Sequence, residues 1–429
     1  MTTAKLHQAF LNSDSLSTDT RTMLPGAIFF ALSGENYNAN LFVEKAFDKG
    51  ASYVVMDDAK LYDKTNKRML FVKNTLKALQ DLAAYHRQYL GLPIIALTGS
   101  NGKTTTKNLI NKVLSKKFVV QATEGNLNNH IGVPLTLLSM TEDHDLGIVE
   151  MGANHPGEID LLCHIAQPNF GYITNFGKAH LEGFGSLEGV VQAKTELYRY
   201  LASKGGYVFV NKNDAKQLEL SENQNRILFG PSELDGEDVQ LLTAQPKLKF
   251  RYKSEAISTN LVGAYNFINC AAAIVIGEYF GVSKGDIVKA ISVYTPDNNR
   301  SELVKTDRNL LLLDAYNANP TSVRAAIKSF IADASHSNKV LILGDMLELG
   351  SFAVKEHQDI VDLLAAHTTM KVYLVGENFN NAKNFASHIT IYKTRGEIEK
   401  VLREEPLNAS YILLKGSRGI ALENLVKYL

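Results

Sequence analysis

The stretch "LPIIALTGSNGKTT", residues 92–105, determines how the rest of the chain is interpreted. Its apolar run, residues 94–97, predicts a buried strand, and a helical pattern begins after the lysine. Glycines between a strand and a helix let backbone N–H groups turn toward one anion, and the start of the helix adds its positive end. This order predicts a phosphate-binding loop. The candidate phosphate ligands are Gly99, Ser100, Asn101, Gly102, Lys103, Thr104 and Thr105.

The loop departs from the usual G-x-x-x-x-G-K-[ST] spacing, which would place a glycine at Leu97. It is a shortened G-x-x-G-K-T form, in which Lys103 is expected to reach the β and γ phosphates and the Thr104 hydroxyl to bind Mg²⁺. A glycine loop beside a lysine can also be an ordinary turn. The strand and helix on the expected sides favour a nucleotide, although the loop does not distinguish ATP from GTP.

Composition excludes several other classes. A chain of 429 residues is too long for one hydrophobic core, and 45% hydrophobic with 21% charged residues is typical of globular domains. Lys+Arg and Asp+Glu are equal at 45, so we expect neither nucleic acid nor a membrane surface as partner. Cys163 and Cys270 lie in apolar helical stretches, which indicates no disulfide framework or thiol metal site. Without an apolar signal core or spanning segment, the expected location is the cytoplasm.

Strand and helix patterns alternate along most of the chain, which predicts an α/β protein of three domains. Residues 1–92 form a small α+β domain that ends in a helix over 75–90 and a Gly-Leu-Pro linker. Residues 93–296 form a central domain with a mostly parallel sheet of the phosphate-loop type. Residues 297–429 form a C-terminal Rossmann-like α/β domain.

Two residues follow strands of the central sheet, where open α/β sheets present ligand groups. Glu150 ends an apolar strand and could hold a metal that bridges phosphates. His180 follows the next strand in a loop with glycines at 177, 183 and 185, and could bind the same metal. A helix cap or surface acid for Glu150, and a surface histidine for His180, are the simpler interpretations.

Lys194 is a charged residue at a position where the helical pattern predicts an apolar one. In "LEGVVQAKTELYRYL", residues 187–201, the apolar residues predict one helical face, and Lys194 falls on it. Such lysines can extend along the surface with the charge in water. Alternatively, burial lowers the pKa of the amine, so that it reacts as a neutral nucleophile or takes up carbon dioxide to form a carbamate.

Five stretches together resemble the Mur ligases of peptidoglycan synthesis, over nearly the whole chain. They are "TGSNGKTT" at 98–105, "EGNLNNHIGVPLTLL" at 124–138, "EMGANHPGEI" at 150–159, "AHLEGFGS" at 179–186 and "DAYNANPTS" at 314–322. The first is similar to a motif that the family shares with folylpolyglutamate synthases. The second, third and fifth resemble the members that add D-alanyl-D-alanine to UDP-N-acetylmuramoyl-tripeptide.

The resemblance implies roles for particular residues. Lys103 and Thr104 would hold the ATP phosphates and Mg²⁺, Glu150 and His180 would bind metal, and Lys194 would do so as a carbamate. Other ATP contacts would be Asn266 and Asn269 in "GAYNFINCAAA", Arg300 in "DNNR", and Asp314 and Asn317 in "DAYNANP". From the residues alone, the first segment would be a core helix and the last an Asx turn.

The muramyl peptide and the dipeptide would bind elsewhere. The implied substrate contacts are Thr20, Arg21, Asn126, Asn128, Asn129, Lys415, Ser417 and Arg418. The first-domain stretch "TDTRTMLPGAIFFALSGENYNANLF", residues 18–42, departs from the family's usual "GDLFFAL" and "DGHDF" forms at Ala27 and at 38–40. An asparagine-rich turn at 126–129 and a cationic turn at 415–418 are the plain alternatives.

The implied reaction is ATP-dependent amide-bond formation through an acyl phosphate, in the synthesis of the cell-wall precursor. Cofactors would be ATP and Mg²⁺, and the protein would act as a monomer. Two other classes fit the phosphate loop: a folylpolyglutamate synthase-like ligase, and an ATPase that forms no amide. The residues do not tell whether the third peptide position is diaminopimelate or lysine.

Overall fold

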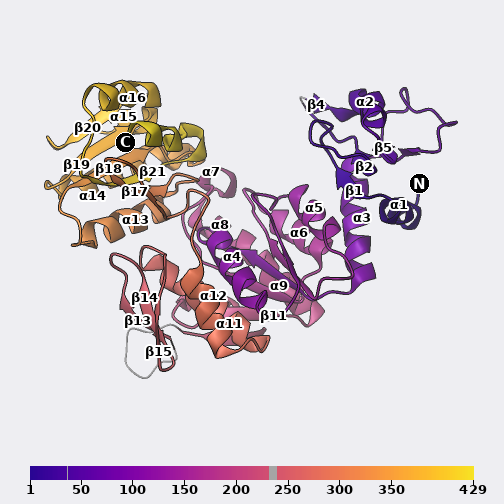
Figure 1. The fold of residues 1–429 in the computed structure, drawn as a ribbon, viewed down its shortest axis with the longest axis horizontal. Coiled ribbons are helices and arrows are strands. Elements are labelled where there is room, and N and C mark those ends of the chain that lie inside the picture. The colour runs from indigo at the N-terminus through magenta and orange to yellow at the C-terminus, as the bar shows by residue number, and fades with distance from the viewer. Residues whose placement is uncertain (36, 231–238) are drawn as a thin grey trace. The chain divides into compact units, whose positions relative to one another are not determined.

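The computed structural model describes residues 1–35, 37–230 and 239–429, so Asn36 of the first-domain stretch lies outside it. The chain divides into two compact units, and the secondary structure of each is labelled in Figure 1. The first unit comprises Met1–Ala96, Phe118–Gly152 and Glu158–Gly171. The second comprises Leu97–Lys117, Ala153–Gly157 and Tyr172–Leu429.

The first unit contains a parallel sheet in the order β1-β2-β5-β6. Its strands are β1 (Ser15–Ser17), β2 (Ala27–Phe30), β5 (Tyr53–Met56) and β6 (Met69–Phe71), with a hairpin β3 (Ser33–Gly34) and β4 (Tyr37–Asn38) beside η1 (Ala39–Phe42) and α2 (Val43–Asp48). Every residue of β2 is buried, because both faces of this sheet are covered. β2, β5 and β6 lie within apolar runs of the sequence at 27–32, 51–56 and 69–72.

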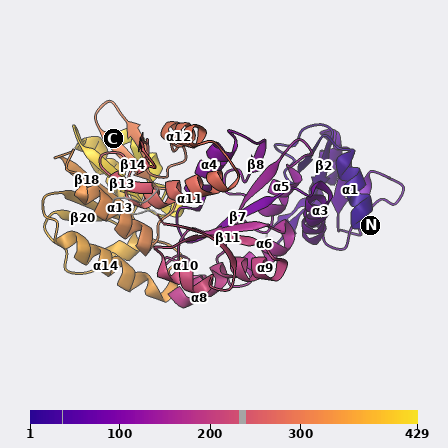
Figure 2. The same cartoon turned by 90° about the horizontal axis from the view of Figure 1, so that it is seen from below.

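Helices of the first unit pack on α3 (Thr75–Leu90), whose bounds agree with the predicted helix over 75–90. The Asn74 side chain accepts a hydrogen bond from the Lys77 N–H at 2.7 Å, and Gly91 ends the helix in a left-handed conformation. α1 (Thr3–Leu11) packs against α3 (Figure 2), as do α5 (Gly132–Leu138) and α6 (Glu158–Ala166).

The strands between residues 94 and 229 have the sheet order β12-β11-β10-β7-β9-β8. Its strands are β7 (Ile94–Thr98), β8 (Val120–Ala122), β9 (Leu146–Glu150), β10 (Phe170–Ile173), β11 (Tyr207–Asn211) and β12 (Asn225–Phe229). Strands β8 and β9 pair in parallel, as do β11 and β12. β7 and β9 are buried along their whole length, which explains why their sequences read as continuous apolar runs.

In the second unit, α4 (Lys103–Leu114) packs against α11 (Tyr265–Tyr279) and α12 (Lys284–Val293). The stretch 187–201, predicted as one helical face, forms two helices, α8 (Leu187–Lys194) and α9 (Glu196–Lys204), with Thr195 between them. The Thr195 hydroxyl donates to the Val191 carbonyl at 2.8 Å, a bond that competes with the helical pattern. Short helices α7 (Leu181–Phe184) and α10 (Ala215–Leu220) complete this region.

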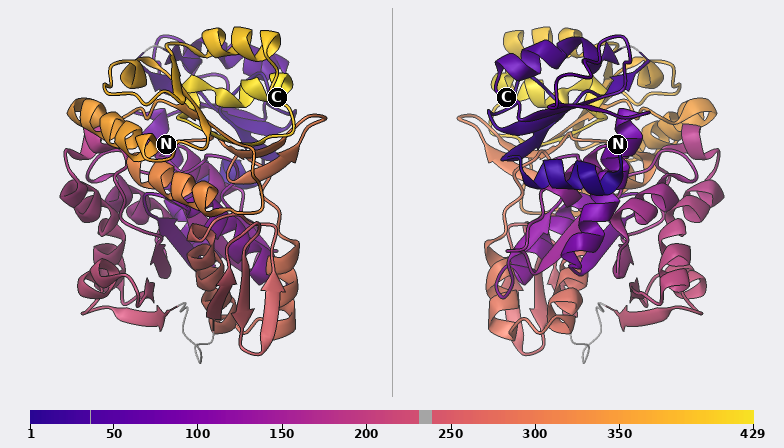
Figure 3. Two further views of the ribbon diagram at one scale, coloured as in Figure 1. Left: turned by 90° about the vertical axis from the view of Figure 1, so that its left-hand side faces the viewer. Right: turned by 90° about the vertical axis from the view of Figure 1, so that its right-hand side faces the viewer.

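An antiparallel sheet in the order β13-β14-β15 also belongs to the second unit (Figure 3). Its strands are β13 (Val239–Thr243), β14 (Lys249–Tyr252) and β15 (Glu255–Ser258), and α12 contacts β15. The sequence patterns did not predict this sheet. β14 alternates exposed and buried side chains, and most side chains of β13 and β15 are partly or fully exposed, so these strands lack the continuous apolar runs of the parallel strands.

The C-terminal sheet has the order β16-β17-β21-β18-β19-β20 and is parallel except for the β16–β17 pair. Its strands are β16 (Glu302–Lys305), β17 (Leu310–Asp314), β18 (Lys339–Gly344), β19 (Lys371–Val375), β20 (Ile389–Tyr392) and β21 (Tyr411–Lys415). Helices α13 (Pro320–Ala332) and α14 (Ala353–Ala365) cover one face and α16 (Arg395–Glu404) the other (Figure 1).

The end of the chain differs from the pattern predicted for it. The predicted alternation of strands and helices would place a helix after the last strand. α15 (Glu377–Asn380) follows β19, but the segment after β21 forms the 3-10 turns η3 (Arg418–Ile420) and η4 (Leu422–Tyr428). In the described part of the chain, no helix has the length and apolar character needed to cross a membrane.

Candidate functional site

The phosphate loop joins the end of β7 to the start of α4 and needs both of its glycines. Gly99 has φ 140° and Gly102 has φ 79°, values that side-chain-bearing residues rarely adopt. A Cβ atom on Gly99 would overlap the Thr174 hydroxyl, and one on Gly102 would lie 2.8 Å from the Asn269 Oδ1. The loop is therefore closely packed on its neighbours as well as sharply curved.

Residues that follow β10 hold the loop by its backbone. The Asn175 side chain accepts from the Asn101 N–H at 3.1 Å and donates to the Asn101 carbonyl at 2.9 Å. The Thr174 hydroxyl donates to the same carbonyl at 2.6 Å. The sequence reasoning missed both residues, although polar side chains directly after a parallel strand are the signal that identified Glu150.

Lys103 and Thr104 lie in the first turn of α4. The Lys103 Nζ donates to the Gly99 carbonyl at 2.7 Å, so the ammonium lies over the loop that the glycines shape. Thr104 is buried, and Ser100 is fixed by its hydroxyl, which donates to the Gly177 carbonyl at 2.8 Å. The loop thus places a cation and a hydroxyl beside its curved backbone.

Asn266 and Asn269 lie on the buried side of α11. The Asn269 Nδ2 donates to the Asn266 Oδ1 at 2.9 Å, and its Oδ1 accepts from the Thr106 hydroxyl on α4 at 3.0 Å. The Asn266 Nδ2 donates to the Val262 carbonyl at 2.8 Å. These amides form a buried chain of hydrogen bonds that ends next to Gly102.

Glu150 is buried at the end of β9 in the first unit. Its Oε1 accepts a hydrogen bond from the Asn128 Nδ2 at 2.9 Å, and its N–H donates to the Thr123 hydroxyl. The Asn129 Oδ1 accepts from two N–H groups at the start of α5, those of Ile131 and Gly132. Among the three predicted asparagines, Asn128 thus contacts the candidate metal ligand and Asn126 is exposed.

His180 has a left-handed backbone conformation, with φ 51°, at the start of α7. Its Nδ1 lies 2.6 Å from the Glu348 Oε2, a carboxylate that follows β18 in the C-terminal sheet. The hydrogen bond with His180 lowers the pKa of Glu348. Sequence reasoning missed Glu348, because 168 positions separate the two residues.

Lys194 is buried, with a residue exposure of 1%, as the helical pattern predicted. Its Nζ donates to the Ala153 carbonyl at 3.2 Å and lies 5.2 Å from the centroid of the Phe184 ring. A carbonyl and an aromatic face stabilise an ammonium, although burial opposes the charge. The alternative of an extended lysine with its charge in water does not apply.

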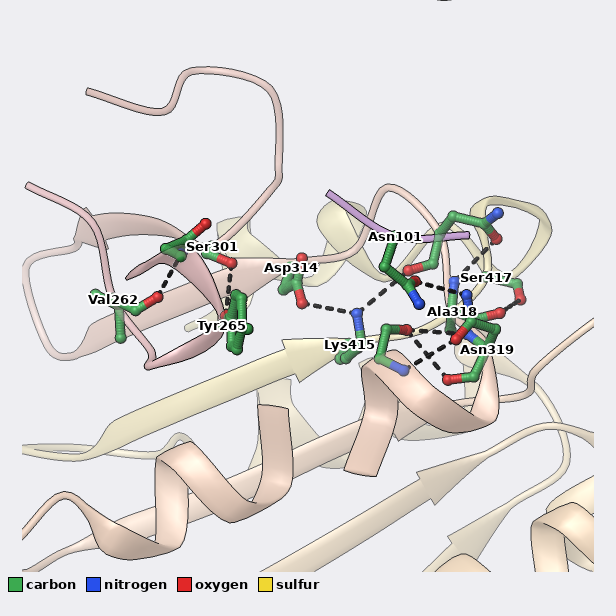
Figure 4. A network of polar contacts seen from close by, with 12 residues as sticks. Asn101, Val262, Tyr265, Ser301, Asp314, Ala318, Asn319, Lys415 and Ser417 are labelled. Carbon is green, nitrogen blue, oxygen red and sulfur yellow. Dashed lines mark hydrogen bonds and ion pairs between the residues drawn. The ribbon is translucent and has the colours of Figure 1, made fainter. Parts of the chain in front are cut away.

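Asp314 and Lys415 come together although they were predicted to contact different ligands (Figure 4). Strands β17 and β21 are parallel neighbours and place these two residues side by side. The Lys415 Nζ lies 2.7 Å from the Asp314 Oδ2 and 3.3 Å from the Asn317 carbonyl. Because Lys415 is buried in this pair, Arg418 is the exposed cation of the C-terminal turn.

Arg300 and Arg418 face the same aromatic ring. The guanidinium of Arg300 lies 3.7 Å from the centroid of the Tyr316 ring, and that of Arg418 lies 5.5 Å from it. The sequence analysis had not selected Tyr316. Ser417, on the same turn as Arg418, is buried and accepts from the Leu347 N–H at 2.9 Å.

Thr20 and Arg21 lie in the first unit. Thr20 is buried, whereas the Arg21 side chain is exposed and pairs with Asp19 at 2.7 Å. This pairing lowers the pKa of Asp19 to about 2.

The predicted site residues therefore fall into two sets. The first unit holds Thr20, Arg21, Asn126, Asn128, Asn129 and Glu150, and the second holds the phosphate loop with His180, Lys194, Asn266, Asn269, Arg300, Asp314, Asn317, Lys415, Ser417 and Arg418. Among the described residues, no group of three or more His, Cys, Asp or Glu side chains is placed to hold a metal ion.

Comparison with known proteins assigns the family. Family models match residues 13–87 (Mur ligase family, catalytic domain), 97–277 (Mur ligase middle domain) and 299–418 (Mur ligase, glutamate ligase domain). The UDP-N-acetylmuramoyl-tripeptide--D-alanyl-D-alanine ligase of Bacillus subtilis (strain 168) is 35% identical over 96% of this chain and 92% of its own length. The enzyme of that name from Escherichia coli (strain K12) is 31% identical over 99% and 95%.

The fold agrees with a solved structure as well. A crystal structure of MurF from Acinetobacter baumannii has a TM-score of 0.86 and 31% identity, and the match covers 99% of this chain and 98% of that one. This similarity confirms the predicted three-domain α/β fold class. The resemblance found in the sequence is also confirmed: the chain belongs to the Mur ligase family.

Proposed function

We propose that this protein is an ATP-dependent, ADP-forming ligase that joins D-alanyl-D-alanine to UDP-N-acetylmuramoyl-tripeptide in peptidoglycan synthesis. The observation that carries the proposal is the curved loop from Gly99 to Thr104, with the Lys103 ammonium held over it at the start of α4. The names of the relatives at 35% and 31% identity support the substrates.

The chemistry requires an activated acid. A carboxylate is a poor acyl donor, so the terminal carboxylate of the tripeptide attacks the γ-phosphorus of ATP, the bond to the β-phosphate oxygen breaks, and ADP leaves. The dipeptide amine then attacks the acyl phosphate, loses a proton, and expels inorganic phosphate as the amide forms. Lys103 would offset the charge that shifts during the phosphoryl transfer.

Other residues would position the nucleotide. Asn269 borders Gly102 and donates to the Asn266 side chain, so this pair of amides is suited to contact the adenine base next to the loop. Arg300 would approach the γ-phosphate, and Asp314 and Asn317 the ribose. Because Lys415 already neutralises Asp314, we assign the dipeptide carboxylate to the exposed Arg418, with Ser417 fixing the turn.

The side chains also fit Mg²⁺, which prefers oxygen ligands. Glu150 supplies a carboxylate and Thr104 a hydroxyl, which are both oxygen donors, and the Glu150 Oε1 accepts a hydrogen bond from the Asn128 Nδ2 at 2.9 Å. Thr104, Glu150, His180 and Lys194, the last as a carbamate, would hold the metal. When bound, Mg²⁺ would neutralise charge on the transferred phosphoryl group.

We assign the muramyl nucleotide to residues 1–92 through Thr20 and Arg21, and its peptide to Asn126, Asn128 and Asn129. Residues 93–296 would bind ATP, and residues 297–429 the dipeptide. We further propose that the protein acts as a cytoplasmic monomer, which cell fractionation and light scattering would test.

Phosphate release with each substrate omitted in turn tests the function. We expect ADP and phosphate to form at a substantial rate only with ATP, UDP-muramyl tripeptide and D-alanyl-D-alanine together. Equal release without either acceptor would indicate an ATPase that forms no amide. Turnover with a folate and glutamate instead would indicate a folylpolyglutamate synthase-like ligase.

A further inference from the structure

The side chain of Asn319 makes two different hydrogen bonds. Its Oδ1 accepts from the Ser322 N–H at 2.9 Å and caps the start of α13. Its Nδ2 donates to the Asn101 Oδ1 in the phosphate loop at 2.7 Å. Because the cap fixes which end of the amide is oxygen, the nitrogen must face Asn101.

Asn101 is therefore held from two directions. The residues after β10, Thr174 and Asn175, bind its backbone. Asn319 binds its side chain (Figure 4). Asn319 and Asn101 are 218 positions apart in the chain. The backbone of the next residue, Gly102, begins the turn into α4, so the position of Asn101 affects the part of the loop that curves.

The segment that carries Asn319 is itself fixed. Lys415 donates to the Asn317 carbonyl at 3.3 Å, and the Ser417 hydroxyl donates to the Ala318 carbonyl at 3.4 Å (Figure 4). Lys178, which follows the loop-holding residues, donates its N–H to the Thr321 hydroxyl at 3.0 Å. Asn319 thus projects from a well-supported backbone.

We infer that Asn319 is a positioning residue for ATP. From its place in the C-terminal segment it holds the Asn101 side chain, and this contact fixes the conformation of the phosphate loop. The inference rests on the proposed use of ATP at this loop. Ordinary helix capping explains the bond to Ser322 but not the bond to Asn101, since a serine or aspartate caps equally well.

Two substitutions separate the cap from the contact. Asn319→Ser keeps an oxygen that accepts from the Ser322 N–H. The serine side chain is too short to reach Asn101, and it has no amide N–H to donate. Asn319→Asp also keeps the cap, and the Asn101 amide can rotate so that its Nδ2 donates to the new carboxylate. Asn74→Ser is the matched control, because it makes the same change at the cap of α3.

The test uses the full chain, with ATP binding measured by calorimetry and KM and kcat measured in the ligase assay. We expect Asn319→Ser to weaken ATP binding and to raise the KM for ATP about three- to ten-fold, because one hydrogen bond is lost. Its melting temperature should be no lower than that of Asn319→Asp, since both variants keep the helix cap. Asn319→Asp should recover most of the affinity, and the control should not change it.

A double variant sharpens the result. Asn101→Ser should weaken ATP binding to a similar degree, and adding Asn319→Ser should weaken it little further, because both remove the same contact. Unchanged ATP affinity in Asn319→Ser, or fully additive effects, would overturn the inference while the ligase reaction stands. If the protein forms no amide in the ligase assay but the variants still bind ATP more weakly, the inference is supported and the proposed substrates are refuted.

Discussion

The Lys194 Nζ donates a hydrogen bond to the Ala153 carbonyl at 3.2 Å, inside a part of the second unit that excludes solvent from the side chain. A buried lysine is costly for stability, so a purely structural role would be poorly served by this residue. The contact keeps the amine at a defined position where a reactive role is possible.

Lys194→Met should therefore abolish ligase activity while leaving the free energy of unfolding equal or higher, because an apolar side chain of similar length replaces a buried charge. Steady-state assays and urea denaturation measure the two quantities. Lys204→Met, at the exposed end of α9, is the control. If the residue acts as a carbamate, short carboxylic acids should restore part of the activity of Lys194→Ala. Full activity in Lys194→Met would contradict the assignment.

Gly99→Ala should destabilise the protein by more than Gly185→Ala. Both positions have positive φ, so both substitutions add about 1 kcal/mol or more of backbone strain, and the strain is greater at Gly99, whose φ of 140° lies outside the left-handed helical region. At Gly99 the new Cβ also overlaps the Thr174 hydroxyl, whereas at Gly185 it meets no atom within 4 Å. Thermal melting compares the two variants. Equal losses of stability would mean that the loop is not packed on β10 as described.

Removing one partner of the Asp314–Lys415 pair should lower the free energy of unfolding more than removing both partners. Asp314→Asn leaves a buried ammonium without its carboxylate, which costs about 3 kcal/mol. In the double variant Asp314→Asn, Lys415→Met, no such charge remains, and part of the stability should return. Chemical denaturation of the single and double variants gives the coupling energy. Strict additivity would argue against a direct interaction.

His7 and His86 should make the first unit sensitive to acid. When both rings are neutral, the His86 Nε2 donates to the Met140 carbonyl at 2.9 Å and its Nδ1 accepts from the His7 Nε2 at 3.0 Å. Burial is the main cause that lowers the pKa of each histidine. The unfolded chain then binds more protons below about pH 6.5, and stability falls as the pH falls, by up to about 1.4 kcal/mol per pH unit for each proton.

His86→Gln should flatten this dependence, since an amide can still donate to Met140 but does not titrate in this range. Urea denaturation between pH 7 and pH 5 measures the slope, with His130→Gln, at an exposed position, as the control. An unchanged slope in His86→Gln would show that the histidine pair is not responsible.

Local patterns predicted the elements whose burial is continuous or strictly periodic. The strand over 94–98 and the helix over 75–90 matched β7 and α3, and the position of Lys194 on a buried face was also foreseen. The break at Thr195 was not, because the apolar periodicity continues through it. A bond from the Thr195 hydroxyl to the main chain, rather than hydrophobicity, accompanies the end of α8.

The parts of the site that escaped prediction depend on contacts between distant segments. Asp314 and Lys415 each follow an apolar strand, but only the order of strands in the sheet makes them neighbours. The pairing of His180 with Glu348 and of Asn101 with Asn319 likewise requires the fold. The residue types were visible in the sequence, and their partners were not.

The break at Thr195 has a consequence for the charge that residue 194 can carry. α8 ends at Lys194 and α9 begins at Glu196, so the side chain starts where the negative pole of one helix dipole meets the positive pole of the next. The two partial charges have opposite signs, so their contributions to the electrostatic potential offset each other at this junction. The helix ends therefore favour neither the ammonium nor an anionic adduct of the same nitrogen, and among the contacts described above it is the Ala153 carbonyl that favours the ammonium.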